Sequence, residues 1–473
     1  MKRMIAFIFC FFLMVSTVNA ASYYVSFTAG ADSNNGTSTG TPWQYSPWQP
    51  SAGGNSDSTT LQPDDFVYFK RGDTWTEQEI IVEDSGTDGH PITLDAYGEG
   101  VDPIFDGNND SGNYYGQFQL FDKSWITIKN LEFRYNGYET ANITADTGEV
   151  QGIVVDGCTF DYNYSDNNDG YMCLVVRNGQ ADSTHTANGV HNIIIQNSTF
   201  KNTGHNGIRF WNRDSTSFIY DVIVRNNTFY NCDHHGIDFW RNSGATYCYN
   251  FTITKNTFQE CQGAMYLPNL HDSEISYNKI YDDNTTESTD TFGIKFDQLN
   301  GTETTNVVFV GNIIYDYTAA GAKAIWVTFT DGVDLYNNTV YGNTQACYVA
   351  FDPANFTNTN NLFYANTSGG NCSNYGSLPL LTNPGGGDFT LQSGSPLIGA
   401  GSDLGNGLQY GLDPTSSWPD NVKPVNQDDY EDWEIGAFVY IEAAELGGPG
   451  TITGGGSGSI AGGGSGSIIG TTP

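Results

Sequence analysis

The chain has 473 residues, enough to bury a substantial core in one large domain or two. Its 18 Lys and Arg against 53 Asp and Glu give a formal charge of −35, which argues against binding to the phosphate backbone of a nucleic acid. An aromatic content of 14% argues against a disordered polyelectrolyte, and 56 Gly disfavour helices. The composition therefore predicts an all-β protein.

Residues 1–20, MKRMIAFIFCFFLMVSTVNA, have the form of an export signal. A basic start at Lys2 and Arg3 precedes an apolar run, and the ending VNA fits a signal-peptidase site. A membrane anchor is the alternative, but the run is shorter than the roughly 20 residues that a span needs. No later stretch is suited to cross a bilayer. We therefore expect a secreted, soluble chain.

Internal repeats follow between residues 125 and 366. Three segments superimpose closely: NIIIQNSTFKNTGHNGIRFW (192–211), DVIVRNNTFYNCDHHGIDFW (221–240) and NFTITKNTFQECQGAMYLP (250–268). Each unit predicts a strand of alternating apolar and polar residues, an Asn-Thr-Phe turn, and a second strand opened by Gly. Because no unit can bury its apolar side alone, the units must stack as a solenoid.

A column of asparagines lies two residues before the closing apolar residue of six successive units. Its members are Asn227, Asn256, Asn278, Asn312, Asn338 and Asn361. Asn tolerates the left-handed backbone of a tight turn, and stacked amides can form hydrogen bonds from coil to coil. We interpret the column as a structural ladder and not as a set of ligands.

Seven cysteines remain after the export signal, and none has zinc-site spacing. Cys232 and Cys261 occupy the same position in adjacent units, so they should stack within disulfide reach. A disulfide there and two free thiols are equally compatible with the sequence.

The repeats resemble the right-handed parallel β-helix of the pectate-lyase superfold, in its secreted, carbohydrate-active form. The segments YYVSFTAGADSNNGT (23–37), FKRGDTW (69–75) and SGTDGHPITLDAYGEG (85–100) look like the usual opening of such proteins. SGSPLIGAGSDLG (393–405) looks like the closing cap. The superfold hosts lyases, hydrolases, epimerases and binding proteins, so the resemblance is specific for fold and not for activity.

The resemblance implies a fold with an N-terminal cap and a C-terminal closing segment around one β-helix. The expected parts are a cap with the first coils at 21–115, the β-helix core at 116–388, the closing segment at 389–440 and a Gly/Ser-rich flexible tail at 441–473. A surface-attachment role is the alternative interpretation of the tail.

The alternation of side chains along a strand predicts which residues of each second strand face solvent. Two positions after the opening residue, the outward column contains Val175, Arg209, Asp238, Met265, Lys295, Trp326 and Tyr348. Four positions after it, the column contains Arg177, Trp211, Trp240, Leu267, Asp297, Thr328 and Ala350. The preceding turns add His205, His234, His235 and Lys323.

Cations and aromatic rings gather on this face, as in a binding groove for an anionic sugar polymer. Exposed aromatic side chains in line along a solenoid indicate a ligand surface, and a basic cleft on an acidic body attracts an anion. We therefore expect a polysaccharide with carboxylate or sulfate groups as partner. The candidate binding residues are Trp211, Trp240, Trp326, Tyr348, Arg177 and Arg241.

Two reactions fit the candidate catalytic residues. In β-elimination from a uronate, Arg209, Arg177 or Ca²⁺ neutralises the carboxylate while Lys295 or His235 removes the neighbouring proton. In hydrolysis, one carboxyl protonates the leaving oxygen and another activates water; Asp238 and Asp297 lie two coils apart, near the upper separation for inversion. The chain lacks the motifs of polygalacturonases, so the lyase is placed slightly ahead of the hydrolase.

Alternatives stay open at each of these positions. Arg209 with Asp238, and Lys295 with Asp297, can be purely structural cross-strand ion pairs. The whole face can belong to a non-catalytic glycan-binding or spike-like adhesin protein, and the oligomeric state stays open between monomer and trimer. Calcium is plausible but unlocated, in the Asp/Asn-rich loops 106–113, 163–170 and 281–290; no organic cofactor is expected.

Overall fold

The computed structural model describes residues 20–442, with gaps at 111–115, 137, 163–171, 180–188, 243, 283–290, 351–353, 406 and 431. Contacts divide the chain into a unit that ends at Tyr440 and a second unit that starts at Ile441. The expected export signal and tail therefore lie outside the described residues, except for Ala20, Ile441 and Glu442. No helix among the described residues is long and apolar enough to cross a membrane.

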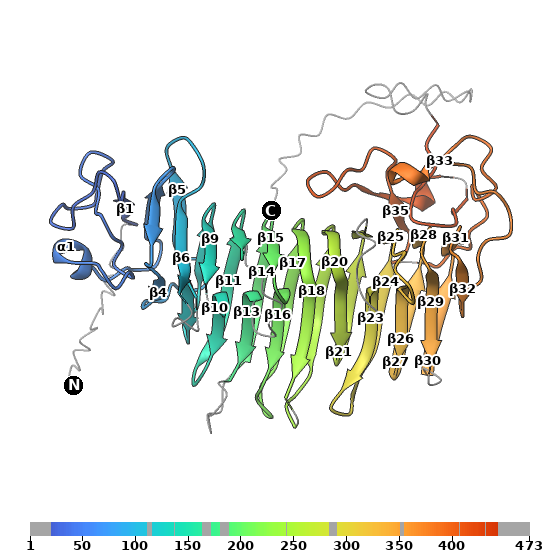
Figure 1. Ribbon diagram of the computed structural model, residues 1–473, viewed down its shortest axis with the longest axis horizontal. Coiled ribbons are helices and arrows are strands. Elements are labelled where there is room, and N and C mark those ends of the chain that lie inside the picture. Colours follow the sequence, from blue (N-terminus) through green and yellow to red (C-terminus); the bar gives the residue numbers. More distant parts are fainter. Residues whose placement is uncertain are drawn as a thin grey trace, which may run out of the picture. The chain divides into compact units, whose positions relative to one another are not determined.

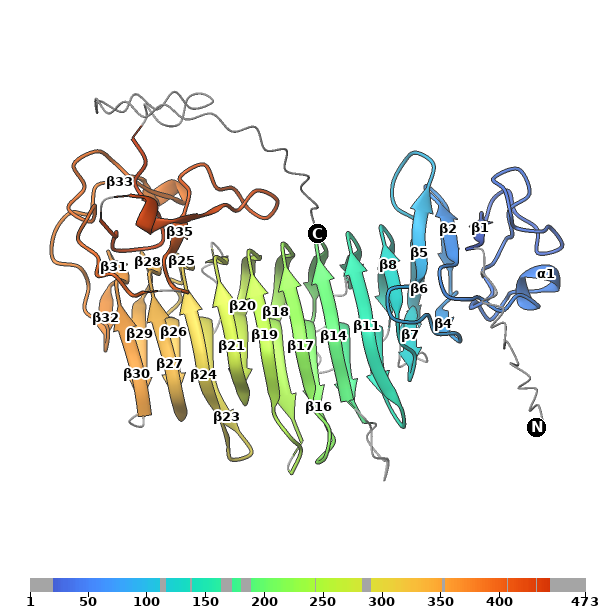
Figure 2. The same cartoon turned by 180° about the vertical axis from the view of Figure 1, so that it is seen from behind.

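The strands form three parallel sheets that run along successive coils (Figures 1 and 2). Sheet 1 contains β1 (Ser22–Val25), β2 (Phe66–Lys70), β5 (Ile92–Tyr97), β8 (Ile126–Lys129), β11 (Glu149–Asp156), β14 (Gly189–Gln196), β17 (Ile219–Arg225), β19 (Cys248–Thr254), β21 (Leu270–Ser276), β24 (Thr302–Val310), β27 (Thr330–Tyr336) and β30 (Ala354–Thr359).

Sheet 2 follows sheet 1 in each coil from β2 onward. It contains β3 (Thr74–Thr76), β6 (Ile104–Asp110), β9 (Glu132–Asn136), β12 (Thr159–Asp161), β15 (Thr199–Thr203), the first parts of β18 (Thr228–Arg241) and β20 (Thr257–Pro268), β22 (Lys279–Tyr281), β25 (Ile313–Tyr315), β28 (Thr339–Tyr341) and β31 (Leu362–Tyr364).

Sheet 3 completes the coil. It contains β4 (Ile80–Val82), β7 (Phe118–Phe121), β10 (Glu139–Ala145), β13 (Met172–Asn178), β16 (Asn206–Asn212), the later parts of β18 and β20, β23 (Phe292–Leu299), β26 (Lys323–Thr328), β29 (Gln345–Ala350) and β32 (Ser368–Gly370). The chain is thus a parallel β-helix, as the repeats predicted.

A stack of aromatic rings runs through the core at sheet 2. Phe160, Phe200, Phe229 and Phe258 are fully buried, and the centroids of successive rings lie 4.9, 5.1 and 4.6 Å apart. These are the phenylalanines of the repeated Asn-Thr-Phe and related turns. Burial of one large side chain in each coil stabilises the stack by about 1.5–3 kcal/mol per ring.

The asparagine ladder is confirmed. Nδ2 of Asn278 donates to Oδ1 of Asn312 at 2.9 Å, and Oδ1 of Asn278 accepts from Nδ2 of Asn256 at 3.0 Å. The same pattern continues to Asn338 and Asn361. Each amide also donates to a backbone carbonyl, as Asn278 does to Ile253 at 2.9 Å, so the buried turns keep their hydrogen bonds.

The coils end at β32, before the boundary that was expected at 388. The chain then leaves the stack and forms two antiparallel pairs, β33 (Leu381–Asn383) with β34 (Asp388–Leu391), and β35 (Tyr410–Leu412) with β36 (Pro424–Asn426). Two short 3₁₀ turns, η1 (Pro384–Gly386) and η2 (Gln427–Asp429), lie among them, and a short helix α1 (Gly54–Asp57) lies near the N-terminus.

The segment from 371 to 440, here called the closing segment, covers the outer face of sheet 2 at the last coils. Its apolar side chains Phe389 and Phe438 belong to one buried cluster with Ile313, Tyr315 and Leu362 of the coils. Figure 1 shows this segment beside β25, β28 and β31. The last coils therefore bury both the inner and the outer face of sheet 2.

One disulfide joins Cys347 and Cys372, which ties β29 to the start of the closing segment. Cys232 and Cys261 are paired in register on adjacent coils, as expected, but both are free thiols. Of the two outcomes that the sequence left open at this pair, the structure has the unbonded one.

Candidate functional site

The candidate site is a row of side chains on the outer surface of sheet 3. The register brings six residues of successive coils side by side: Arg209, Asp238, Tyr266, Lys295, Trp326 and Tyr348. Five of these are the residues that the outward column predicted. The row therefore joins the expected cations, carboxylate and aromatic rings on one face.

The sequence alignment was wrong at one coil. Met265 and Leu267 were expected to face outward, but both are fully buried, and Tyr266 takes the outward position. The register shifts between Cys232 and His235, where β18 has one residue more than β20. One extra residue reverses the side that each following side chain faces, because side chains alternate along a strand.

Asp238 is the centre of a buried polar network. Its Oδ2 accepts from Nε of Arg209 at 2.6 Å and from Nδ2 of Asn206 at 3.1 Å, and its Oδ1 lies 3.1 Å from Nδ1 of His235. The Asp238 side chain is 1% exposed. Burial raises the pKa of this carboxyl, but the Arg209 charge and the His235 hydrogen bond outweigh burial and hold the pKa well below its usual range. Asp238 is therefore a carboxylate.

Three histidines lie against this network. The ring centroids of His205 and His234 are 4.4 Å apart, and those of His234 and His235 are 3.8 Å apart. Burial lowers the pKa of His234 to about 2 and lowers the pKa of His235 as well. His235 is thus neutral near pH 7. With Nδ1 donating to Asp238, its Nε2 carries the lone pair, and among the described residues that atom makes no hydrogen bond.

Lys295 lies two coils from Asp238 in the row, with Tyr266 between them. Its Nζ lies 2.8 Å from Oδ2 of Asp297, 4.3 Å from the ring centroid of Trp326 and 5.1 Å from that of Tyr266. The carboxylate and the ring faces hold the charged end of Lys295 in place. Burial raises the pKa of the Tyr266 phenol, and the nearby charges of Asp297 and Asp238 raise it further. Tyr266 therefore keeps its proton.

Aromatic rings lie both beside the row and at its end. Beside Arg209, Trp211 and Trp240 lie next to each other in register, 5.6 and 5.5 Å from its guanidinium, and Trp240 is 37% exposed. At the end of the row, the ring centroids of Trp326 and Tyr348 are 5.9 Å apart. Within the described part of the chain, the indole N–H of Trp326 is buried and has no acceptor.

Two expected binding residues lie elsewhere. Arg177 is 1% exposed and forms a buried ion pair with Glu139. Arg241 is also buried and donates to the backbone carbonyls of Ala245 and Asn300, at 2.6 and 3.0 Å. Both side chains hold neighbouring segments of the β-helix and do not join the row.

The two ion pairs that the sequence offered as structural alternatives are present, at 2.6 Å for Arg209 with Asp238 and 2.8 Å for Lys295 with Asp297. Their side chains are at most 19% exposed. Burial at this level exceeds that of an ordinary surface pair, so each pair fixes the position of a charged group under the aromatic rings.

No calcium site is placed by the structure. Among the described residues, no three His, Cys, Asp or Glu side chains form a group that could hold a metal ion. The loop 163–170, most of the loop 281–290 and part of the loop 106–113 lie outside the described residues.

Comparisons with known proteins agree on the fold. A family model described as a right handed beta helix region matches residues 185–324 and 245–384. The structure is similar to that of the GH136 lacto-N-biosidase from Eubacterium ramulus, with a TM-score of 0.50 and 15% identity over 71% of this chain and 65% of that one. The fold is therefore a right-handed parallel β-helix.

Two further likenesses involve enzymes. The chain is 28% identical over 168 residues to a lacto-N-biosidase of Bifidobacterium longum subsp. longum. The aligned region covers 30% of this chain and 10% of that protein. The crystal structure of pectate lyase Pel9A aligns with a TM-score of 0.41 and 16% identity, over 89% of this chain and 97% of that one. The chain thus spans about a tenth of the curated relative and just under two thirds of the Eubacterium structure.

Proposed function

We propose that this protein is a secreted, carbohydrate-active β-helix enzyme that cleaves an acidic polysaccharide by β-elimination at the row on sheet 3. One observation carries the proposal. A neutral histidine, oriented by a buried carboxylate, lies beside a protonated tyrosine and two cations, next to aromatic rings of which Trp240 is exposed. This is the set of groups that proton abstraction next to a carboxylate requires.

The residues divide the work as follows. Lys295 and Arg209 bind the uronate carboxylate and neutralise the charge that develops there. Nε2 of His235 takes the proton from the carbon next to the carboxylate, and that electron pair forms the new carbon–carbon double bond. The bond to the glycosidic oxygen breaks, and Tyr266 gives its proton to that oxygen. The proton on His235 then returns to Tyr266 through solvent, which restores the enzyme.

The aromatic rings position the polymer. Trp240, which is exposed, and its neighbour Trp211 offer flat faces on which sugar rings can lie beside the reacting unit. Polymer chains placed along the row would cross successive coils.

Hydrolysis is the second candidate, because the chain is similar to a lacto-N-biosidase over 168 residues. In that case Asp297 and Asp238 would be the paired carboxyls. Asp238 is ill suited to donate a proton, since Arg209 and His235 hold it as a carboxylate. The elimination therefore has the stronger chemical support.

The test follows two products. The chain from residue 21 is incubated with polymers of galacturonate, mannuronate, guluronate and glucuronate and with neutral polymers, in calcium and in chelator. Ultraviolet absorbance together with new reducing ends supports elimination, and reducing ends without absorbance support hydrolysis at Asp297. Silence in both assays, with polymer still retained by the protein, would overturn both enzymes in favour of a glycan-binding or adhesin protein. Light scattering on the same sample decides between monomer and trimer.

A further inference from the structure

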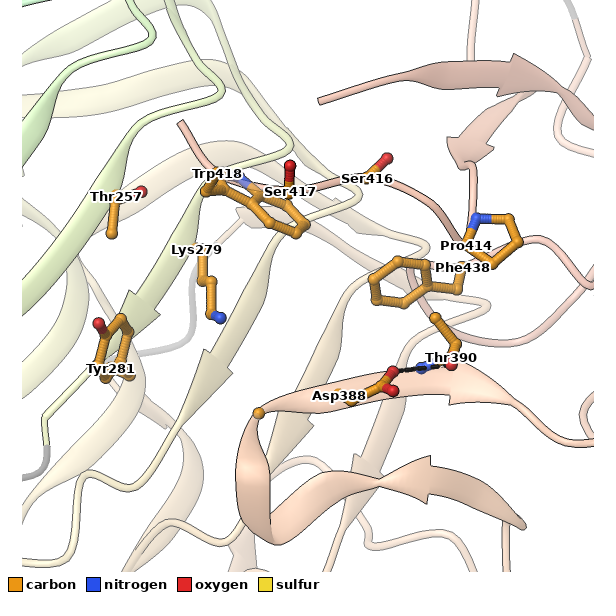
Figure 3. Close-up of a pocket in the computed structure, with 11 residues that line it drawn as sticks. Thr257, Lys279, Tyr281, Asp388, Thr390, Pro414, Ser416, Ser417, Trp418 and Phe438 are labelled. Atoms are coloured by element: carbon orange, nitrogen blue, oxygen red, sulfur yellow. Dashed lines mark hydrogen bonds between the residues drawn. The ribbon is translucent and has the colours of Figure 1, made fainter. Parts of the chain in front are cut away.

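A cavity lies on a different sheet from the row, where the closing segment meets the coils. Its volume is about 400 Å³, within the range of sites for small ligands. Lys279 and Tyr281 of β22 form one wall, and Asp388, Trp418 and Phe438 of the closing segment form the other (Figure 3). The cavity is separate from the row on sheet 3.

Its position follows from where the closing segment stops. Lys279 stands in register with Thr257 on one side and with Ile313 on the other. Ile313 is buried under the closing segment, whereas Thr257 of the preceding coil is only half-buried. Lys279 therefore lies at the edge of the region of sheet 2 that the closing segment covers, and the cavity opens at this edge.

The ammonium of Lys279 points into the cavity (Figure 3). Among the described residues its Nζ makes no hydrogen bond and no ion pair. The centroids of the Tyr281, Tyr315 and Trp418 rings lie 5.5, 5.6 and 5.9 Å from Nζ, near the outer limit for a cation–π contact. Burial lowers the pKa of Lys279, and the Asp388 charge partly offsets this effect. A partly desolvated cation with such distant rings is best satisfied by an anion.

Asp388 supplies the opposite charge at the far side of the cavity. Its Oδ1 accepts from the backbone N and the hydroxyl of Thr390, at 3.1 and 2.7 Å. Among the described residues its Oδ2 accepts no hydrogen bond, so that oxygen can accept from a ligand hydroxyl. The cavity therefore offers one cation and one acceptor at separate places.

Two rings form a fixed apolar wall between these groups. Nε1 of Trp418 donates to the carbonyl oxygen of Tyr277 at 2.8 Å, which holds the indole against the coils. Phe438 meets Trp418 edge-on, at 6.5 Å between centroids and 81° between planes. An apolar corner of two nearly perpendicular rings, with a cation at one end and a hydroxyl acceptor at the other, matches a sugar ring that carries a carboxylate.

We propose that the cavity between β22 and the closing segment binds a hexuronate unit, with its carboxylate on Lys279, its hydroxyls toward Asp388 and its ring against Trp418 and Phe438. This site is independent of the proposed lyase row. It would hold an acidic saccharide on a face of the β-helix that performs no cleavage.

The test is a calorimetric titration with matched pairs: galacturonate and galactose, glucuronate and glucose, mannuronate and mannose. We expect at least one acid to bind about tenfold more tightly than its parent sugar, the contribution of one charge-assisted contact. Lys279→Met should abolish this preference, and Lys279→Arg should retain it. The titration is then repeated with dimers and trimers of the preferred acid. Tighter binding of the oligomers indicates a site for a polymer, and tighter binding of the monomer indicates a site for the free sugar.

Lys295→Met separates this proposal from the proposed function. Retained binding in Lys295→Met with loss in Lys279→Met supports the cavity, whatever the outcome at the row. The reverse pattern places the binding at the row and overturns the cavity proposal, as would equal affinities for acid and parent sugar or no binding of any acid.

A measurement on the unmodified chain does not depend on the folding of a variant. Acetylation of each lysine is followed by mass spectrometry with and without the preferred acid. Lys279 should be protected by the acid and not by the parent sugar, while Lys123, which is far along the coils, should react equally in both. Equal acetylation of Lys279 with and without the acid would overturn the proposal.

Discussion

Nδ1 of His235 lies 3.1 Å from Oδ1 of Asp238, and both side chains are nearly completely buried. The carboxylate fixes the tautomer of the imidazole, because it can only accept. The other ring nitrogen is left to act on a ligand. This pair gives the proposed site its most specific chemical feature.

His235→Gln should remove the base while the chain remains folded. We expect kcat to fall by about 10²–10⁴-fold, the usual contribution of a general base. The assay is ultraviolet absorbance of the unsaturated product. His191→Gln is the matched control, since His191 lies on sheet 1 and contacts Glu149 at 3.0 Å. Equal rates for His235→Gln and wild type would contradict the assigned role.

The pH profile of kcat/KM should have its acid limb below pH 6.5. Burial lowers the pKa of His235 from 6.5, so the neutral form that acts as a base persists to lower pH than in a free histidine. Activity should therefore persist to a lower pH than an ordinary histidine base would allow. An acid limb centred above pH 6.5 would point to a different base.

Trp240→Ala should weaken polymer binding and leave the chemical step intact. Trp240 is 37% exposed beside Arg209, so its loss removes contact area without opening the core. We expect KM to rise about tenfold with little change in kcat. Replacement of exposed Tyr230, which lies on sheet 2, by Ala is the control and should leave KM unchanged.

Asn278→Ala should destabilise the stack strongly. The substitution leaves the buried partners in Asn256, Asn312 and Ile253 without their hydrogen bonds, which costs about 2–4 kcal/mol in the free energy of unfolding. Asn361→Ala should cost less, because this last rung is only half-buried and water can replace its amide. Urea denaturation measures both; equal losses would contradict the ladder as a buried network.

Glu434→Gln should raise stability at pH 8. Burial raises the pKa of Glu434 to about 7 from 4.5, so the unfolded chain loses this proton first. The buried, protonated Glu434 makes its full contribution to the free energy of unfolding below pH 4.5. This contribution is lost as the pH rises from 4.5 through 7. Gln keeps an oxygen for the backbone N of Tyr440 and carries no charge. We expect a gain of about 2 kcal/mol at pH 8 and none at pH 4, measured by thermal unfolding.

The repeat was sufficient to predict most of the fold. Phenylalanines such as Phe200 and Phe229 occur once in each of these coils, at the same position of the repeat. Their burial in a single stack follows directly from this recurrence. The disulfide could not be predicted, because Cys372 follows the last recognisable repeat and its neighbour Cys347 belongs to the coils. The packing of the closing segment on sheet 2 depends on contacts across long stretches of chain and leaves no periodic signal.

The candidate site was predicted in outline but not in detail. Alignment on Gly236 and Gly263 placed Met265 outward, whereas one extra residue in β18 turns Tyr266 to the surface. Alignment on apolar side chains instead of glycines would have revealed the shift, because Met265 then falls opposite Ile237. Asn206 was also missed, since its contact with Asp238 depends on the geometry of one turn.

The closing segment and the Cys347–Cys372 disulfide also make the two ends of the β-helix unequal in their resistance to local unfolding. In a one-dimensional stack each coil is held only by its neighbours, so separation begins at an end. At the C-terminal end the last coils are crosslinked and are packed against Phe389 and Phe438 on their outer face. Fraying from that end requires the closing segment to detach first, so the coils that it covers stay ordered while coils farther from it open.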